Sequence, residues 1–155
     1  FKPGGTITAA NASKINDGAA ALVLAAQPAG RKVLARIKGW ATFSQEPEWF
    51  TTAPAGAIEK LLARVGWKKE EVDLYEINEA FAVVALAVMK RLGLPHEKVN
   101  VNGGAVALGH PIGASGARIL VTLLHALEAR GLTRGVASIC LGGGEAVAVA
   151  VERGS

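Results

Sequence analysis

Residues 135–152 read GVASICLGGGEAVAVAVE, and this stretch indicates the fold more clearly than any other part of the chain. It consists of two apolar runs, 135–141 and 145–152, joined by three consecutive glycines. Two apolar runs with a short glycine link between them are typical of a β-hairpin. Because a hairpin pairs its strands antiparallel, and helix patterns alternate with strand patterns upstream, we expect a mixed sheet in an α/β domain.

The residues upstream of the hairpin predict further strands and helices. Strands are expected at residues 6–9, 32–43 and 72–77, with a short extended segment at 98–102. A first helix is expected from Asn16 or Asp17 to Ala26. A second follows a loop at 44–56 and ends near Gly66. Two more are expected over 79–92 and from about 116 to Arg130. The first helix contains AAALVLAA, and a helix that is apolar all round is typically buried. We therefore predict helices on both faces of the sheet and one buried central helix.

Composition excludes several classes of protein. The chain has 155 residues, half of them hydrophobic, which is enough for one domain with its own core. Its formal charge of +4 favours anionic partners, but the basic residues are scattered, so we expect no nucleic-acid partner. The apolar runs are shorter than the roughly 20 residues that cross a bilayer, so we expect no membrane span. One cysteine and no leader pattern predict a reducing, cytoplasmic location.

Four short polar stretches lie in apolar or glycine-rich surroundings, where chemistry can be built. They are Asn11–Ser13, Asn78–Phe81, Gly103–Gly116 and Cys140–Gly144. The first two also have a purely structural interpretation. Ser13 or Asn16 would cap the first helix and Asn78 the helix that follows it, because Asn and Ser are favoured N-cap residues. A side-chain amide at a helix start can equally hold a water or an oxyanion.

His110 and Cys140 are the candidate acid–base and thiol groups. His110 precedes Pro111 on a stiff glycine-rich loop, and imidazole titrates near neutrality. That loop lacks the spacing of phosphate-binding and dinucleotide-binding loops. Cys140 is either a small core residue or a reactive thiol beside backbone N–H groups of the glycine turn. The sequence lacks metal-ligand spacings, so no metal is expected, whereas a Cys–His protease or esterase stays open at this point.

Four stretches taken together resemble the thiolase family. They are GTITAANASKINDGAAA near the start, EINEAFA in the middle, NVNGGAVALGHPIGASGAR after it, and CLGGG near the end. Their order and spacing are similar to those of thiolases, and they cover nearly the whole chain. The resemblance implies that residues 1–155 form a C-terminal thiolase domain with a layered α/β core and buried central helices. It also implies acyl transfer on CoA thioesters by reversible Claisen condensation.

The resemblance implies a catalytic role for four residues. His110 resembles the histidine that activates the acyl-accepting nucleophile and helps to form an oxyanion hole. Asn78 resembles the asparagine that holds a water in that hole. Cys140 resembles the second catalytic cysteine, which moves the α-carbon proton of the attacking acyl-CoA. Gly142 resembles the glycine whose N–H contributes to a second oxyanion hole.

The resemblance also implies contacts with substrate and with a missing partner. Ala12, Ser13 and Phe81 would bind the CoA-linked substrate; CoA and acyl-CoA are substrates, and no cofactor is implied. Thiolases carry a separate nucleophilic cysteine in an N-terminal half, whereas the single cysteine here matches the other role. We therefore expect this chain to need that half, in a parent enzyme that is a homo-oligomer, a dimer or a tetramer.

Two alternatives remain beside the thiolase interpretation. A ketoacyl synthase-type condensing enzyme would use a cysteine with two histidines and a different terminal glycine motif, so the Asn78 and Cys140 motifs argue against it. A non-catalytic acyl-CoA-binding or scaffold domain of the same fold is the other alternative. The presence of Asn78, His110 and Cys140 argues against it, whereas the missing nucleophile argues for it.

Overall fold

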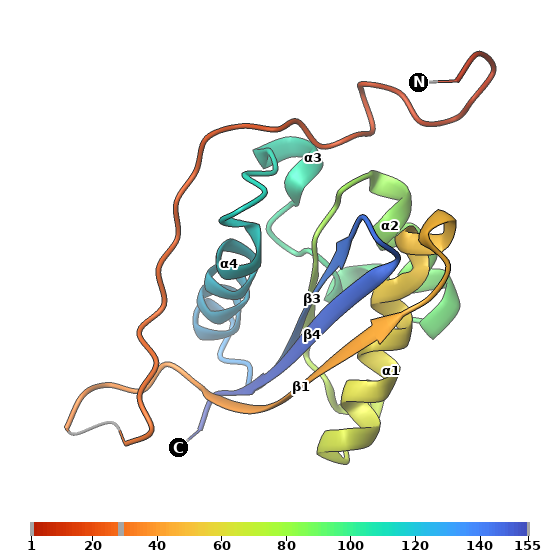
Figure 1. Ribbon diagram of the computed structural model, residues 1–155. Coiled ribbons are helices and arrows are strands. Elements are labelled where there is room, and N and C mark those ends of the chain that lie inside the picture. Colours follow the sequence, from red (N-terminus) through yellow and green to blue (C-terminus); the bar gives the residue numbers. More distant parts are fainter. Residues whose placement is uncertain (1, 28–29, 155) are drawn as a thin grey trace.

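The fold is built on one mixed, four-stranded sheet. The computed structural model describes residues 2–27 and 30–154. The strands lie in the order β1-β4-β3-β2 (Figure 1). Their bounds are β1 Arg36–Ser44, β2 Leu74–Ile77, β3 Arg134–Leu141 and β4 Glu145–Glu152. The hairpin β3–β4 and the pair β1–β4 are antiparallel, whereas β2 and β3 are parallel, so the predicted mixed sheet is confirmed.

Helices cover both faces of this sheet, as predicted (Figure 1). The α-helices are α1 Ala53–Val65, α2 Ala82–Leu92, α3 Ala105–Leu108 and α4 Ser115–Ala129. Three short 3-10 helices accompany them at Pro47–Thr52, Lys69–Glu71 and His96–Lys98. Helix α1 contacts β1, β4 and β3, and α4 contacts β3 and β2 from the opposite side. The described part of the chain has no helix long and apolar enough to span a bilayer.

Alternating side chains of the strands divide the core into two clusters. Tyr75 and Val136 belong to the cluster under α1 and α2, whereas their neighbours Leu74 and Ala137 belong to the cluster under α4. This alternation follows from the two-residue period of a strand. It explains why β2 and β3 are apolar on both sides, since each face is covered by a helix.

The sequence predicts where the helices end more accurately than where they start. Gly66 and Gly93 follow α1 and α2 with φ of 71° and 64°, the left-handed conformation that ends a helix. Helix α1 begins earlier than expected, at Ala53, because Pro54 is accommodated in its first turn. Strand β1 begins at Arg36 rather than residue 32, and residues 98–102 form isolated bridges instead of a strand.

The prediction for the N-terminal segment is wrong. Neither the strand at 6–9 nor the buried helix at 16–26 is formed, and the segment runs extended past α3 and along α4 (Figure 1). Its apolar side chains are largely exposed: 79% for Ile15 and 86% for Val23. A helix of this length is marginal on its own, and one that is apolar all round needs neighbours on every side. Within the described chain, a helix at 16–26 would have α4 as its only neighbouring helix.

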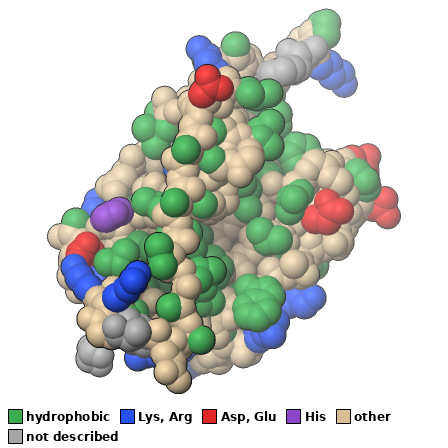
Figure 2. Space-filling model, turned by 60° about the vertical axis from the view of Figure 1, so that its left-hand side comes forward, with side chains coloured by type: hydrophobic (Ala, Val, Ile, Leu, Met, Phe, Trp, Pro, Cys, Tyr) green, Lys and Arg blue, Asp and Glu red, His purple; other side chains and the backbone are tan. Residues whose placement is uncertain are grey.

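The exposed segment borders an open apolar hollow of about 780 Å³. Its walls are the segment itself, the start of β1 and the outer face of α4 with Leu120, Val121 and Leu124. Figure 2, in which this side comes forward, shows many hydrophobic side chains around the hollow. A soluble domain rarely leaves so much apolar surface uncovered, so this face has the character of an interface.

Candidate active site

Two loops meet at one edge of the sheet and bring Asn78 to His110. Asn78 follows β2 directly, is 1% exposed, and donates its backbone N–H to Ser138 O at 2.9 Å. It does not cap α2, which begins at Ala82. Its side chain is therefore available to the site, where Nδ2 lies 3.4 Å from His110 Nε2. The structure thus brings together two of the predicted catalytic residues.

His110 is held on three sides. Its backbone N–H donates to Lys14 O at 2.7 Å, and its Nδ1 lies 2.6 Å from the hydroxyl of Ser115. That hydroxyl, fully buried at the start of α4, also donates to Pro111 O at 3.1 Å. Burial and then the positive charge of Arg118 lower the pKa of His110, so the neutral imidazole is favoured at pH 7.

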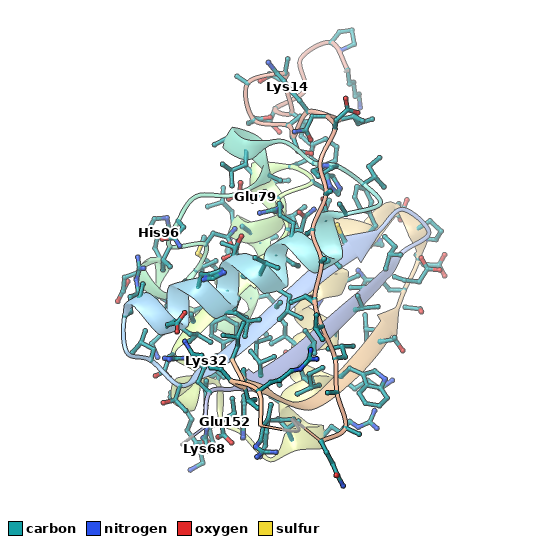
Figure 3. All side chains as sticks on the ribbon, turned by 90° about the vertical axis from the view of Figure 1, so that its left-hand side faces the viewer. Lys14, Lys32, Lys68, Glu79, His96 and Glu152 are labelled. Carbon is teal, nitrogen blue, oxygen red and sulfur yellow. The ribbon has the colours of Figure 1, made fainter. Side chains whose placement is uncertain are left out.

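Residues 11–14 join the two loops. Ala82 N donates to Asn11 O at 2.8 Å, and Ser13 donates both its N–H and its hydroxyl to Ala80 O, at 3.0 and 2.9 Å. Between them Ala12 pairs with Phe81 as an antiparallel bridge. Figure 3 shows Lys14 on this segment, above the sheet and above Glu79. The predicted substrate-binding residues Ala12, Ser13 and Phe81 therefore lie side by side, next to Asn78.

Glu79 and Asn100 hold the glycine-rich loop in place. The Glu79 carboxylate accepts from Asn100 Nδ2 and from Val106 N, both at 3.1 Å. Asn100, at φ 49°, pairs its side-chain amide with both backbone groups of Ile77 at 2.7 and 2.8 Å. Sequence reasoning placed Glu79 in the first turn of a helix and gave Asn100 no role. In the structure Glu79 binds the start of α3 instead.

Cys140 lies at the end of β3, before the glycine turn. It is partly buried against the core cluster under α1 and α2 and sits opposite Ala146 of β4. Burial raises the pKa of its thiol, so the thiol form dominates at pH 7. Gly142 follows in the exposed turn, where an added Cβ would meet no atom within 4 Å. Within the described residues, Cys140 does not share the hydrogen bonds that join Asn78 and His110.

Two ionisable residues near this site, the half-buried Arg118 and the buried Glu76, were missed from the sequence. Arg118 of α4 donates Nη2–H to Asn78 Oδ1 at 3.3 Å. Glu76 of β2 is 2% exposed, and burial raises its pKa to about 8 against the opposing positive charge of Arg118. The available signal for Arg118 was its position three residues after Ser115, on the same side of α4. Among the described residues, no group of three potential metal ligands gathers.

The comparisons with known proteins show the family of this chain. Residues 31–153 match the family profile described as the thiolase C-terminal domain, and residues 1–28 match the thiolase N-terminal domain. This chain belongs to the thiolase family. The two matches of this thiolase chain meet between residues 28 and 31.

Relatives and a solved structure align along nearly the whole thiolase chain. Acetyl-CoA acetyltransferase 2 of Arabidopsis thaliana is 61% identical over 96% of this chain and 38% of the relative. The cytosolic acetyl-CoA acetyltransferase of Mus musculus is 56% identical over 97% of this chain and 39% of the relative. The Bacillus anthracis acetyl-CoA acetyltransferase structure superimposes with a TM-score of 0.95, at 50% identity, over 99% of this chain and 40% of that one. The chain thus spans about two fifths of the length of these proteins.

Proposed function

We propose that this chain supplies the His–Asn–Cys part of a thiolase active site, which forms or cleaves the carbon–carbon bond of 3-ketoacyl-CoA. The contact between Asn78 Nδ2 and His110 Nε2, built from two loops and tied by residues 11–14, is the observation that carries the proposal. Thiolase membership and relatives named acetyl-CoA acetyltransferases support the same reaction class.

His110 is the proposed base for the nucleophile. Its lowered pKa keeps the imidazole neutral, so Nε2 can take the proton of a cysteine thiol contributed by the N-terminal half. Once protonated, Nε2–H can donate to the thioester oxygen on which negative charge develops. The Asn78 amide beside it is placed to hold a water for the same oxygen.

Cys140 is the proposed acid and base at the α-carbon. In the cleavage direction the nucleophilic thiolate adds to the 3-keto carbonyl, the bond between the α- and β-carbons breaks, and the enolate of acetyl-CoA takes the thiol proton of Cys140. The acyl group then passes from the nucleophile to the sulfur of a second CoA. The raised pKa of the Cys140 thiol suits proton donation to a carbanion, and the Gly142 N–H would stabilise the oxyanion on the acyl carbonyl.

Substrate binding is proposed along the antiparallel contact of residues 11–13 with residues 80–82. Backbone pairing fixes Ala12 and Ser13 beside Phe81, whose ring meets Phe50 edge to face at 6.2 Å between centroids. An apolar strip with few free polar groups suits the pantetheine arm of CoA better than its nucleotide. No cofactor beyond the CoA substrates is proposed.

The partner is the remainder of a thiolase, which would carry the nucleophilic cysteine. The chain covers 38% of its Arabidopsis relative, and its exposed apolar hollow and N-terminal segment offer a surface for the missing part. Covering that surface would also supply the neighbours that a helix at 16–26 requires. We further propose a cytoplasmic enzyme, after the cytosolic mouse relative, and a homo-oligomeric parent on the family resemblance alone.

The direct experiment is thiolysis of acetoacetyl-CoA by CoA, followed by the loss of enolate absorbance. The chain is assayed alone, and mixed with the part of the Arabidopsis relative that precedes its matched segment. We expect activity on mixing, and its loss in Cys140→Ala. Activity of the chain alone would overturn the division of roles. A stable but inactive complex of the two parts would favour the acyl-CoA-binding or scaffold alternative.

A further inference from the structure

A half-buried arginine lies beside the two proposed catalytic side chains, Asn78 and His110. Arg118 comes from α4, one turn after Ser115, and its guanidinium reaches Asn78 Oδ1 through Nη2 at 3.3 Å. Its Nε and Nη1 are buried and have no hydrogen-bond partner among the described residues. Burying a guanidinium with unsatisfied donors is costly, which suggests a role that packing alone does not explain.

Arg118, Asn78, His110 and Ser115 form a row of hydrogen-bonded side chains. The donors and acceptors along this row can be assigned in one consistent way. Arginine has five donors and no acceptor, so the Asn78 atom facing Arg118 must be the carbonyl oxygen. The Asn78 Nδ2–H group then points to His110, and the ring nitrogen that it meets, Nε2, must accept. A flipped amide would set two donors against each other at Arg118.

The other side of the imidazole completes the row. With Nε2 as the acceptor, the proton of neutral His110 lies on Nδ1, which donates to Ser115 Oγ at 2.6 Å. The Ser115 hydroxyl keeps its own proton for Pro111 O, at 3.1 Å. The row therefore runs from Arg118 through Asn78, His110 and Ser115 to a backbone carbonyl, with each member donating to the next.

We propose that Arg118 is a positioning residue that sets the tautomer of His110 through Asn78 and keeps Nε2 unprotonated, so that it can take a proton. Its importance for catalysis rests on the proposed function, in which Nε2 takes the proton of the nucleophilic thiol. The tautomer itself is a property of this chain, independent of substrate and of the missing half.

The charges around the row support this assignment. The ionisable groups of the elements packed around it include Glu76 of β2, Glu79 after it, Cys140 of β3, Arg118 itself and Lys14 of the N-terminal segment. The other ionisable groups of β2, β3 and α4 bond elsewhere: Tyr75 to Lys69 O, Arg134 to Glu71 and Glu152, and His125 to Glu128. Glu76 is protonated at pH 7 because burial raises its pKa to about 8, and Cys140 is a neutral thiol. The Glu79 carboxylate accepts hydrogen bonds from Asn100 Nδ2 and Val106 N. After burial, the positive charge of Arg118 is the cause that lowers the pKa of His110, and it opposes protonation of the imidazole.

The test is nitrogen-15 NMR of the ring nitrogens of His110 in the labelled 155-residue chain. The chain has three histidines, and His110→Gln identifies the signals of His110. We expect the Nδ1–H tautomer above pH 7 and a pKa below 6.5. A dominant Nε2–H tautomer in the unaltered chain would overturn the proposal without any variant.

Three variants separate positioning from simple structural support. Arg118→Met should raise the pKa of His110 and mix the tautomers, whereas Arg118→Lys, which keeps a charged donor, should restore both. Asn78→Asp accepts from Arg118 but cannot donate, so it should hold a proton on Nε2. Arg130→Met, the loss of an exposed arginine just after α4, is the control and should change nothing. An Arg118→Met chain with an unchanged His110 tautomer and pKa would contradict the proposal. If that variant does not fold, an Asn78→Asp chain that keeps the Nδ1–H tautomer of His110 would contradict it.

Discussion

At the scale of single residues, the site depends on polar groups that are buried for a reason other than packing. Asn78, Ser115 and Glu76 are nearly inaccessible, although most of the other buried side chains are apolar. Each buried polar group costs free energy unless a partner satisfies it, and the first two have such partners. Glu76 instead meets this cost by staying protonated.

Glu76 should make the stability of the fold depend on pH. Its pKa is raised from 4.5 to about 8 in the folded chain, so the folded state binds more protons than the unfolded state across this range. Stability is therefore full below pH 4.5 and falls as the pH rises through about 8. Glu76→Gln should gain about 2–4 kcal/mol relative to the unaltered chain between pH 5 and pH 9.

Urea unfolding at pH 5, 7 and 9 measures this difference. Glu97→Gln, the same change at an exposed glutamate, serves as the control and should follow the unaltered chain at every pH. If the stability curves of Glu76→Gln and the unaltered chain run parallel, Glu76 does not change its protonation on folding.

Gly104 should be intolerant of a side chain because of Glu79. A Cβ at Gly104 would collide with the Glu79 carboxylate, which would have to leave Asn100 and Val106 N. Losing these two hydrogen bonds should cost Gly104→Ala about 1–3 kcal/mol of unfolding free energy. Gly113→Ala, in the same loop but with no atom near its added Cβ, should change stability far less. Equal losses of stability in the two variants, measured by thermal unfolding, would show that the collision with Glu79 does not cause the loss in Gly104→Ala.

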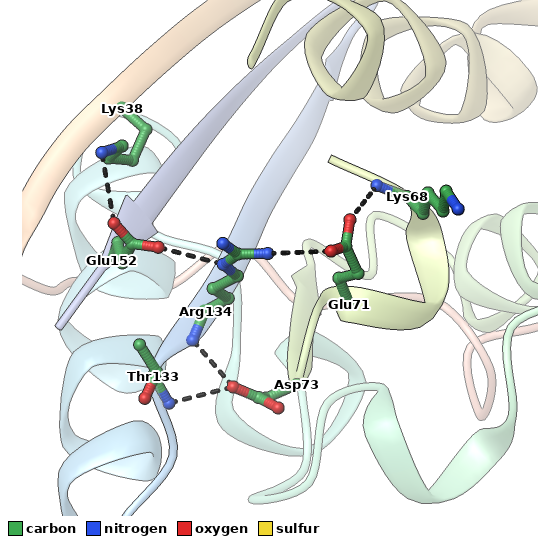
Figure 4. Close-up of polar contacts among 7 residues, drawn as sticks. All are labelled: Lys38, Lys68, Glu71, Asp73, Thr133, Arg134 and Glu152. Carbon is green, nitrogen blue, oxygen red and sulfur yellow. Dashed lines mark hydrogen bonds and ion pairs between the residues drawn. The ribbon is translucent and has the colours of Figure 1, made fainter. Parts of the chain in front are cut away.

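At the scale of elements, one arginine ties the end of the sheet together. Arg134 opens β3 and bonds Glu152 of β4 at 3.0 Å and Glu71 of the Lys69–Glu71 turn at 3.4 Å (Figure 4). Its guanidinium also lies 4.8 Å from the centroid of the Trp67 ring. These contacts join three elements that are distant in sequence, so they are set by the fold rather than by local pattern.

Arg134→Met should lower the melting temperature, and the loss should shrink at high salt because exposed ion pairs are screened. Lys32→Met removes a single pair, Lys32–Glu128, whose lysine is 75% exposed, and should have almost no effect. Thermal unfolding at low and at high salt checks both variants. A salt-independent loss in Arg134→Met would assign the effect to packing on Trp67 instead.

The elements also mark where sequence reasoning succeeds and fails. The hairpin at 135–152, the glycine ends at Gly66 and Gly93, and helix α4 follow from local pattern, because their partners lie within the chain. The helix at 16–26 was predicted from an apolar pattern that needs neighbours on every side, which the described chain lacks.

The site divides in the same way. His110, Asn78 and Cys140 carry motifs that can be recognised, whereas the contact of Arg118 with Asn78 becomes visible only through the fold. It lies 40 positions from Asn78 in sequence, so no local pattern links the two.

At the scale of the whole molecule, the exposed apolar face should control assembly with the missing half. Val23 and Leu24 are 86% and 74% exposed and line the hollow beside α4. Replacing both with Asp should leave the melting temperature of the chain unchanged, because neither is in its core. Pairing with the N-terminal part of a thiolase should weaken at least 100-fold, since two buried charges cost several kcal/mol.

Analytical ultracentrifugation of the mixed halves measures that pairing. Lys2→Asp, a charge change at an exposed residue of the same segment and away from the hollow, is the control and should pair normally. Undiminished pairing by the double Asp variant would show that the partner binds elsewhere on the chain.

The central claim is that this chain provides the His–Asn–Cys part of a thiolase site, and a fusion tests it most directly. The chain replaces the matched segment of the Arabidopsis relative, to which it is 61% identical, and thiolysis of acetoacetyl-CoA is measured. We predict activity within about tenfold of the parent, and a loss of about 10²–10⁴ in Cys140→Ala and in His110→Ala. A folded fusion without activity, or one whose activity survives both substitutions, would contradict the account.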